Sequence, residues 1–168
     1  MIQVFFIRLV RFLALVAFPV LLLNHIQLWG LGTPMVYVSF LLYMPLVSQR
    51  VPTLLWAFSI GLVVDVFSNT PGMSSGAMTL TAMIQPSILS LLAPRDAPDN
   101  LVPTYHTLGK LNHVSYVMLV YMVHHLAYFF IESFSFYDIW ATILGMVVSW
   151  TVSVSIALAL ESFRHGGR

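Results

Sequence analysis

Six polar side chains with the chemistry to bind a metal ion, relay a proton or join helices lie within long apolar runs or at their edges. They are Asn24, His25, Asp65, His124, His125 and Glu132. An ionisable group inside a membrane-spanning segment is costly, so its default interpretation is a site that faces other helices rather than lipid. Asp65 is the clearest case, because it is the only ionisable residue in the apolar run 53–68.

Metal binding and catalysis are the less favoured uses of these residues. His25, Asp65, His124 and His125 have suitable ligand types, but no tight spacing such as HExxH is present. Adjacent histidines point about 100° apart on a helix, so His124 and His125 cannot both reach one ion without distortion. A P-loop is also missing from the sequence. We therefore expect no enzyme activity, no catalytic residue, no metal and no other cofactor.

A structural network is the favoured role for Asp65. The residue lies near the C-terminal end of its expected helix, where the helix dipole disfavours an anion. Compensation can come from a histidine at the same depth, from the N–H groups that begin the next helix, or from a partner protein. In such a hydrogen-bonded network we expect Asn at position 65 to preserve the structure largely and Ala to loosen it.

Composition identifies the class of protein. The 168 residues are 59% hydrophobic and only 8% charged, with a mean hydropathy of +0.89, which is typical of an integral membrane protein. A net charge of +1 without a Lys/Arg cluster gives no footprint for nucleic acid. The absence of cysteine excludes disulfides and thiolate metal sites. We expect one domain, 1–168, embedded in a lipid bilayer.

Six apolar segments predict a bundle of six transmembrane helices. They are residues 12–29, 34–47, 53–68, 72–93, 113–131 and 139–160, and most approach the ~20 residues that cross a bilayer. The second is short and contains Pro45, so its length alone also allows a re-entrant segment. With both termini in the cytoplasm, all seven Lys and Arg residues fall inside, as the positive-inside rule requires. The first segment is expected to be an uncleaved span.

The predicted orientation brings several polar residues to one depth near the outer face. Asn24 and His25 of the first span, Asp65 of the third, and His124 and His125 of the fifth share this level, with Glu132 just above. Between the third and fourth spans, Thr70 is expected to be the N-cap and Pro71 the first helical residue of a tight hairpin. The connection 93–110, rich in proline, is expected to be extended and exposed.

Several motifs resemble the MreD family of rod-shape-determining membrane proteins. They are Leu-Asn-His-Ile at 23–26, Leu-Tyr-Met-Pro at 42–45, GLVVDVFSNTPGM at 61–73, Pro-Arg-Asp at 94–96 and HHLAYFFIESFSFYD at 124–138. The resemblance covers nearly the whole chain. One departure is Gln85 before Pro86, where the family pattern would have an arginine.

The resemblance implies a non-enzymatic protein of the bacterial inner (cytoplasmic) membrane, similar in fold to the substrate-binding subunits of energy-coupling-factor transporters. It would act with MreC, with the MreB filament, and with RodA and a class B penicillin-binding transpeptidase in the elongasome, which makes peptidoglycan and maintains the rod shape of the cell. Gly61, Leu62, Asp65 and Gly72 would shape a hairpin near the surface that faces MreC. The alternative is a substrate-binding subunit of a vitamin-type transporter, which should hold a polar, ligand-sized cavity in the outer layer.

Overall fold

The computed structural model describes residues 34–45, 50–98, 101–132 and 139–165. Every regular element within these ranges is helical. They are the 3-10 turn η1 (Val36–Val38), α2 (Ser39–Leu42), α3 (Arg50–Ser68), α4 (Met73–Leu92), α5 (Tyr105–Leu108), α6 (Lys110–Glu132) and α7 (Ile139–His165). The helical class expected from the sequence is therefore confirmed for the described residues.

Four of these helices are long and apolar enough to cross a membrane: α3, α4, α6 and α7. Their bounds agree within a few residues with the last four predicted spans, because a continuous apolar run of this length has few other stable forms in lipid. The first predicted span, with Asn24 and His25, lies outside the described residues. The complete six-helix bundle and the position of both termini stay predictions.

The second predicted span differs from the expectation. Within 34–45 the chain forms only η1 and α2, which together run from Val36 to Leu42 and are far shorter than the ~20 residues that cross a bilayer. Helix α2 ends at Leu42, shortly before Pro45, because a proline disfavours helical geometry in the residue before it. The described part of this segment therefore contains no spanning helix, and its short helical stretch agrees with the re-entrant alternative.

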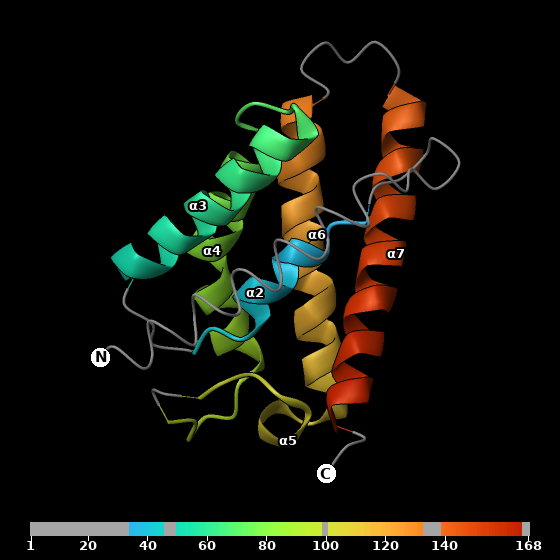
Figure 1. Ribbon diagram of the computed structural model, residues 1–168. Helices are drawn as coiled ribbons and strands as arrows, with labels where there is room; N and C mark the ends of the chain where they lie inside the picture. Colours follow the sequence, from blue (N-terminus) through green and yellow to red (C-terminus); the bar gives the residue numbers. More distant parts are fainter. Residues whose placement is uncertain (1–33, 46–49, 99–100, 133–138, 166–168) are drawn as a thin grey trace.

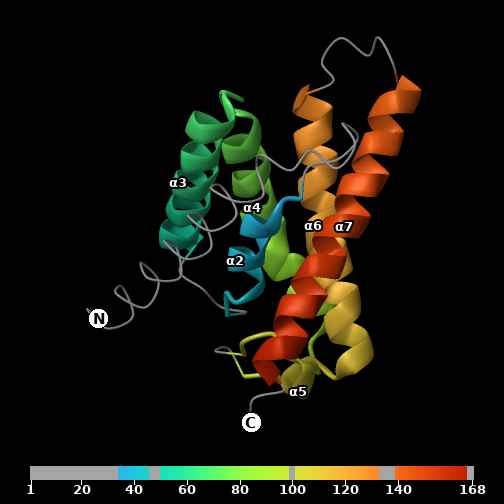
Figure 2. The same ribbon diagram turned by 45° about the vertical axis from the view of Figure 1, so that its right-hand side comes forward.

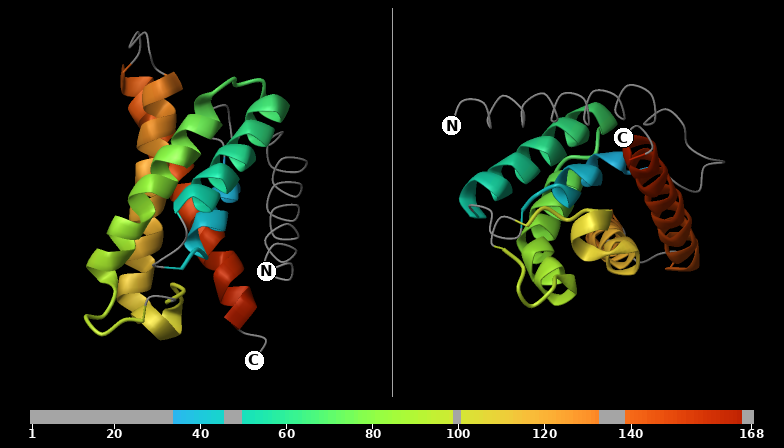
Figure 3. Two further views of the ribbon diagram at one scale, coloured as in Figure 1. Left: turned by 90° about the vertical axis from the view of Figure 1, so that its left-hand side faces the viewer. Right: turned by 90° about the horizontal axis from the view of Figure 1, so that it is seen from below.

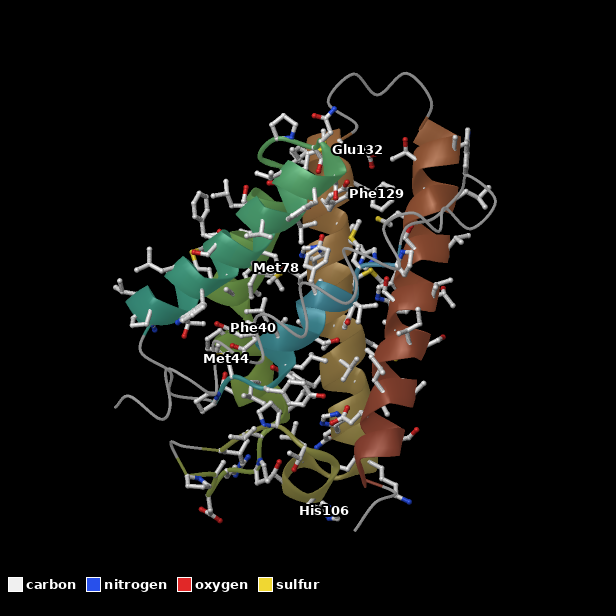
Figure 4. All side chains as sticks on the ribbon, viewed as in Figure 1. Phe40, Met44, Met78, His106, Phe129 and Glu132 are labelled. Carbon is white, nitrogen blue, oxygen red and sulfur yellow. The ribbon has the colours of Figure 1, made fainter. Side chains whose placement is uncertain are left out.

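The long helices form two antiparallel pairs with α2 between them (Figures 1 and 2). Helix α3 pairs with α4, α4 packs against α6, and α6 pairs with α7. Seen along the bundle, α2 lies in the space that the two pairs leave (Figure 3). The side chains of Val38 in η1 and Leu41 in α2 are fully buried. Phe40 of α2 and Met78 of α4 both lie in this central region, away from His106 at one end and Glu132 at the other (Figure 4).

One close contact sets the approach of α3 and α4. A Cβ atom at Gly61 would lie 2.3 Å from the Cα atom of Ser75 and 2.6 Å from the Ser74 carbonyl oxygen. Only glycine leaves room for the two backbones at this distance.

On the other side of α3, Leu55, Phe58, Leu62 and Val66 are exposed and form an apolar stripe suited to lipid or to another membrane protein.

The connection between α4 and α6 is more ordered than the proline content indicates. Leu101 and Leu108 are buried in the core, and α5 begins with a capping box in which the side chains of Thr104 and Thr107 each bond to the other residue's backbone N–H. The segment closes the end of the bundle at which α6 starts and α7 finishes (Figure 1). The extended, exposed loop expected from the sequence is wrong at these positions.

Gly61→Ala should destabilise the α3–α4 pair. The added methyl group meets backbone atoms that cannot move aside, so we expect a loss of about 2 kcal/mol or more in the free energy of unfolding. Unfolding of the purified protein in mixed detergent micelles, followed by tryptophan fluorescence, measures this loss.

Gly76→Ala is the matched control, because its new Cβ meets only the flexible tip of Ile131 at 3.3 Å. The control should unfold close to wild type. Equal stability of the two variants would contradict the close contact at Gly61.

Candidate functional site

The Asp65 carboxylate is the centre of the best-defined polar site. It is 3% exposed and accepts five hydrogen bonds from the segment that follows it. Oδ1 accepts from the Ser74 N–H at 2.7 Å and from the Thr70 hydroxyl at 3.2 Å. Oδ2 accepts from the Gly72 N–H at 3.1 Å and from Ser75, by its N–H at 3.0 Å and its hydroxyl at 2.8 Å. Of the three sources of compensation expected from the sequence, the N–H groups of the next helix are the ones observed.

This carboxylate completes the N-terminus of α4. The first four N–H groups of a helix have no partner within it. Here Asp65 accepts from Gly72, Ser74 and Ser75, and the Met73 N–H bonds to the Thr70 carbonyl at 3.3 Å. An anion at a helix N-terminus is also stabilised by the helix dipole. The N-terminus of α4 thus stabilises the Asp65 anion, which the C-terminal end of its own helix α3 disfavours.

The turn between the two helices is built to bring the carboxylate back onto α4. Asn69 has a positive φ of 56°, and the Thr70 N–H bonds to the Asp65 carbonyl at 3.1 Å, which is the 6→1 bond of a Schellman motif. Gly72 follows with φ of 87° and is the N-cap of α4. The prediction of Thr70 as N-cap and Pro71 as first helical residue is wrong by two residues, because the Asp65 side chain and not Thr70 caps the helix.

His124 belongs to the same network through Tyr37 of η1. Its Nε2 atom lies 3.1 Å from the Tyr37 hydroxyl, which also interacts with the side chain of Ser74. Its Nδ1 atom lies 3.5 Å from Thr81 Oγ1, whose proton is donated to the Ala77 carbonyl. Nδ1 is therefore the protonated nitrogen, and Nε2 accepts from Tyr37. The chain Asp65, Ser74, Tyr37, His124 joins α3, α4, η1 and α6.

His125 makes a second junction, on the side of α7. Its Nδ1–H donates to the Tyr121 carbonyl at 2.8 Å, and its Nε2 atom lies 3.4 Å from Ser153 Oγ. The Ser153 hydroxyl donates to the Ser149 carbonyl at 2.6 Å and accepts from the Met35 N–H at 2.9 Å. Both histidines are fully buried. The His124 bond to Tyr37 joins α6 to η1, and the Met35–Ser153 bond beside His125 joins the start of η1 to α7.

Further polar pairs continue along α6 away from this layer. The Ser39 and Tyr121 hydroxyls lie 2.8 Å apart, and the Gln85 amide donates to the Tyr116 hydroxyl at 2.7 Å. Gln85 occupies the position where the resemblance leads one to expect an arginine. It is fully buried, and its Oε1 atom has no hydrogen-bond partner.

A buried contact between a histidine and a glutamate lies at the opposite end of the bundle from Asp65. His113 Nε2 of α6 and Glu161 Oε2 of α7 are 2.7 Å apart and both residues are buried. The ring of Tyr105 from α5 covers His113 with its centroid 4.4 Å away. Partial burial and then the nearby Glu161 carboxylate raise the pKa of the Tyr105 phenol above its ordinary value. No local pattern in the sequence predicts this pair, because its members are 48 positions apart.

The other predicted site residues have more peripheral places. Gly61 and Gly72 form the helix contact and the N-cap, whereas Pro71 and Glu132 are exposed. Leu62 is 47% exposed on the outer face of α3. Pro45 follows α2 and is half-buried. Tyr128, one turn after His124, lies near Asp65 and Thr70, which agrees with the common depth expected for α3 and α6.

Three further contributors were missed: Tyr37, Ser74 and Ser75. The two serines had a usable signal, because they occupy the second and third positions of α4, where free N–H groups occur. Tyr37 had none, since its partner His124 is 87 positions away.

The site offers little for catalysis within the described residues. Residues 72–76, Gly-Met-Ser-Ser-Gly, match the letters of the GxSxG nucleophile elbow, but that motif joins a strand to a helix and here α3 precedes it. Ser74 is buried and faces Tyr37 rather than a histidine. Across the described ranges no three His, Asp or Glu side chains gather in a way that could hold a metal ion.

Comparisons of the chain with protein-family models, with curated proteins and with solved structures find no match.

Substitution of Asp65 should destabilise the hairpin even when the shape is preserved. In Asp65→Asn the new NH₂ group must face either the Ser74 N–H or those of Gly72 and Ser75, so a donor opposes a donor. This geometry replaces the expectation that Asn largely preserves the structure. We expect both Asp65→Asn and Asp65→Ala to lose at least about 2 kcal/mol of unfolding free energy. Unfolding of the purified variants in mixed detergent micelles measures this loss of free energy.

Asp96→Asn supplies the control, since Asp96 is an exposed carboxylate beyond α4. It should behave as wild type. Were Asp65→Asn as stable as Asp96→Asn, the five accepted bonds would not be stabilising α4.

A double-mutant cycle tests the Gln85–Tyr116 pair. Tyr116→Phe leaves a buried amide without any partner and should cost about 1–3 kcal/mol. Adding Gln85→Leu removes that amide, so the double variant should recover most of the loss. Unfolding free energies of the four proteins give the coupling, and purely additive effects would contradict a direct bond.

Proposed function

We propose that this chain is a non-enzymatic scaffold or regulator of the MreD type in the bacterial inner membrane. In this role it acts with MreC, MreB, RodA and a class B penicillin-binding transpeptidase during cell-wall elongation. The observation that supports the proposal best is the filling of the polar layer around Asp65 by side chains. A scaffold needs such a layer to hold a surface in shape, whereas a carrier needs it open.

The filled layer favours the scaffold over a transporter subunit. Asp65, His124 and His125 are at most 3% exposed, and their bonds are to groups of the same chain. A small-molecule site usually occupies about 300–1,000 Å³ with several polar groups turned inward. The described cavity between α3 and α4 measures about 140 Å³ and lies near Arg50, at the other end of α3.

The arrangement of cations supports the proposed orientation. Arg50 begins α3, Arg95 follows α4 and Lys110 begins α6, so each lies at a helix end away from the α3–α4 turn. If these ends face the cytoplasm, the turn and Glu132 face outward, in accordance with the positive-inside rule. MreC, which extends outward from the membrane, would then meet the end of the hairpin that Asp65 organises.

Leu62 is the best candidate for a direct contact with MreC. Among the residues that the resemblance places near this surface, Gly61, Asp65 and Gly72 are used inside the hairpin. Leu62 points outward from the same turn of α3, where a membrane partner can reach it.

Co-purification from native membranes tests the function. The tagged full chain, extracted in mild detergent, should retain MreC together with components of the elongation complex, identified by mass spectrometry. Recovery of a transport ATPase module in place of MreC would overturn the scaffold and favour the transporter subunit.

Leu62→Ala should lower the recovery of MreC severalfold while the protein stays folded, because loss of a buried apolar contact at an interface costs about 1 kcal/mol or more. The matched control is Leu55→Ala, two turns away on the same face of α3 and also exposed. Equal recovery of MreC with Leu62→Ala and Leu55→Ala would show that Leu62 does not contact MreC.

A further inference from the structure

A second site lies at the end of the hairpin that Asp65 does not occupy. A cavity of about 140 Å³ opens there between α3 and α4. On α3 it is lined by Arg50, Thr53 and Leu54, at the start of the helix, and on α4 by Ala82, Met83, Pro86 and Ser87. None of these residues takes part in the Asp65 network.

The cavity follows from how the two helices are joined. At Gly61 and Ser75 the backbones touch, since no Cβ fits between them. From that contact the helices separate toward their other ends, as Figure 1 and the view from below in Figure 3 show. About three helical turns separate Gly61 from Arg50, or ~16 Å. Side chains that fill the narrow part of the hairpin do not fill this wider part.

The lining combines one cation with an apolar floor. Arg50 is exposed and is the only charged residue of the lining, with no carboxylate beside it in the cavity. Leu54, Pro86 and Met83 supply apolar surface, and Met83 is 64% exposed, so the floor continues to the outside of the bundle. A ligand that suits this lining carries a negative group joined to an apolar part.

Helix α4 also offers acceptors at this place. Pro86 has no N–H, so the Ala82 carbonyl four residues earlier loses its partner in the helical ladder. Ala82 and Pro86 both line the cavity, and the hydroxyl-bearing Ser87 follows them. A ligand whose negative group carries hydroxyls can therefore be bound by Arg50 and donate to α4.

We infer that this cavity binds one anionic phospholipid of the phosphatidylglycerol type from the inner leaflet. The phosphate pairs with the Arg50 guanidinium, the head-group hydroxyls face α4, and part of an acyl chain lies along Leu54 and Met83. A zwitterionic lipid fits less well, because its ammonium group finds no carboxylate in the lining. The lipid site is independent of the proposed scaffold function and of any protein partner.

Retention of lipid by the full chain tests the site. The protein is placed in nanodiscs of phosphatidylcholine with phosphatidylglycerol, transferred to detergent and examined by native mass spectrometry. Wild type should keep one phosphatidylglycerol in preference to phosphatidylcholine. Arg50→Gln should reduce that preference about tenfold, the loss expected for one charge-assisted contact.

Arg95→Gln is the matched control, because Arg95 is an exposed cation outside the cavity. It should leave retention unchanged. Ala82→Leu fills the cavity with Arg50 in place and should reduce retention as well, provided that its thermal unfolding resembles that of wild type. Addition of soluble glycerol 3-phosphate should not displace the lipid, because it lacks the apolar part.

Four results would overturn the inference. They are unchanged retention in Arg50→Gln, an equal loss in Arg95→Gln, equal retention of phosphatidylcholine by wild type, and displacement of the lipid by glycerol 3-phosphate. The last result would indicate a site for a free phosphate ester and not for a lipid.

Discussion

The bond set between the Asp65 carboxylate and the N-terminus of α4 is the interaction on which the rest of the structure depends. A carboxylate among apolar helices needs donors, and the first N–H groups of a helix need acceptors that neither lipid nor apolar side chains supply. Each group satisfies the other across a turn of four residues, 69–72. The positive φ values of Asn69 and Gly72 allow the chain to reverse within that length. The buried carboxylate and the free N–H groups would each be unfavourable alone, and the bonds between them determine the direction of α4 relative to α3.

The position of the remaining helices follows from two sets of polar bonds, one of which starts at this turn. Ser74 leads to Tyr37 and His124, and a separate set joins Met35, Ser153 and His125. In a bilayer, burial of apolar surface between helices provides little driving force, because lipid tails are as apolar as leucine. Close packing of small residues and interhelical hydrogen bonds then select one register among many. The short α2 illustrates this effect, since hydroxyl groups on α2 and η1 attach it to α6.

Sequence patterns predicted the four long helices and the Asp65 hairpin, because hydropathy and length restrict what a 20-residue apolar run can do. They did not predict the form of 34–45, where an apolar run suits both a spanning helix and a buried wedge. The choice depends on neighbours that hydropathy does not describe. For Asp65 the sequence left three partners open, and the local one proved correct. Tyr37–His124 and His113–Glu161 join distant positions, and residue types alone do not show which distant groups meet.

The two ends of the α3–α4 hairpin have opposite chemistry, and this difference separates its roles. At the Asp65 end every donor at the start of α4 is bonded to an oxygen of the hairpin itself, so the shape of the turn needs no ligand. At the Arg50 end the helices have moved apart, a cation is exposed, and a proline has released a carbonyl. A closed end that is complete in itself suits contact with a protein through an outward side chain such as Leu62. An open end with one cation and an apolar floor suits a molecule of the bilayer. Because Gly61 fixes the point from which α3 and α4 separate, the same glycine that closes the first end creates the space at the second.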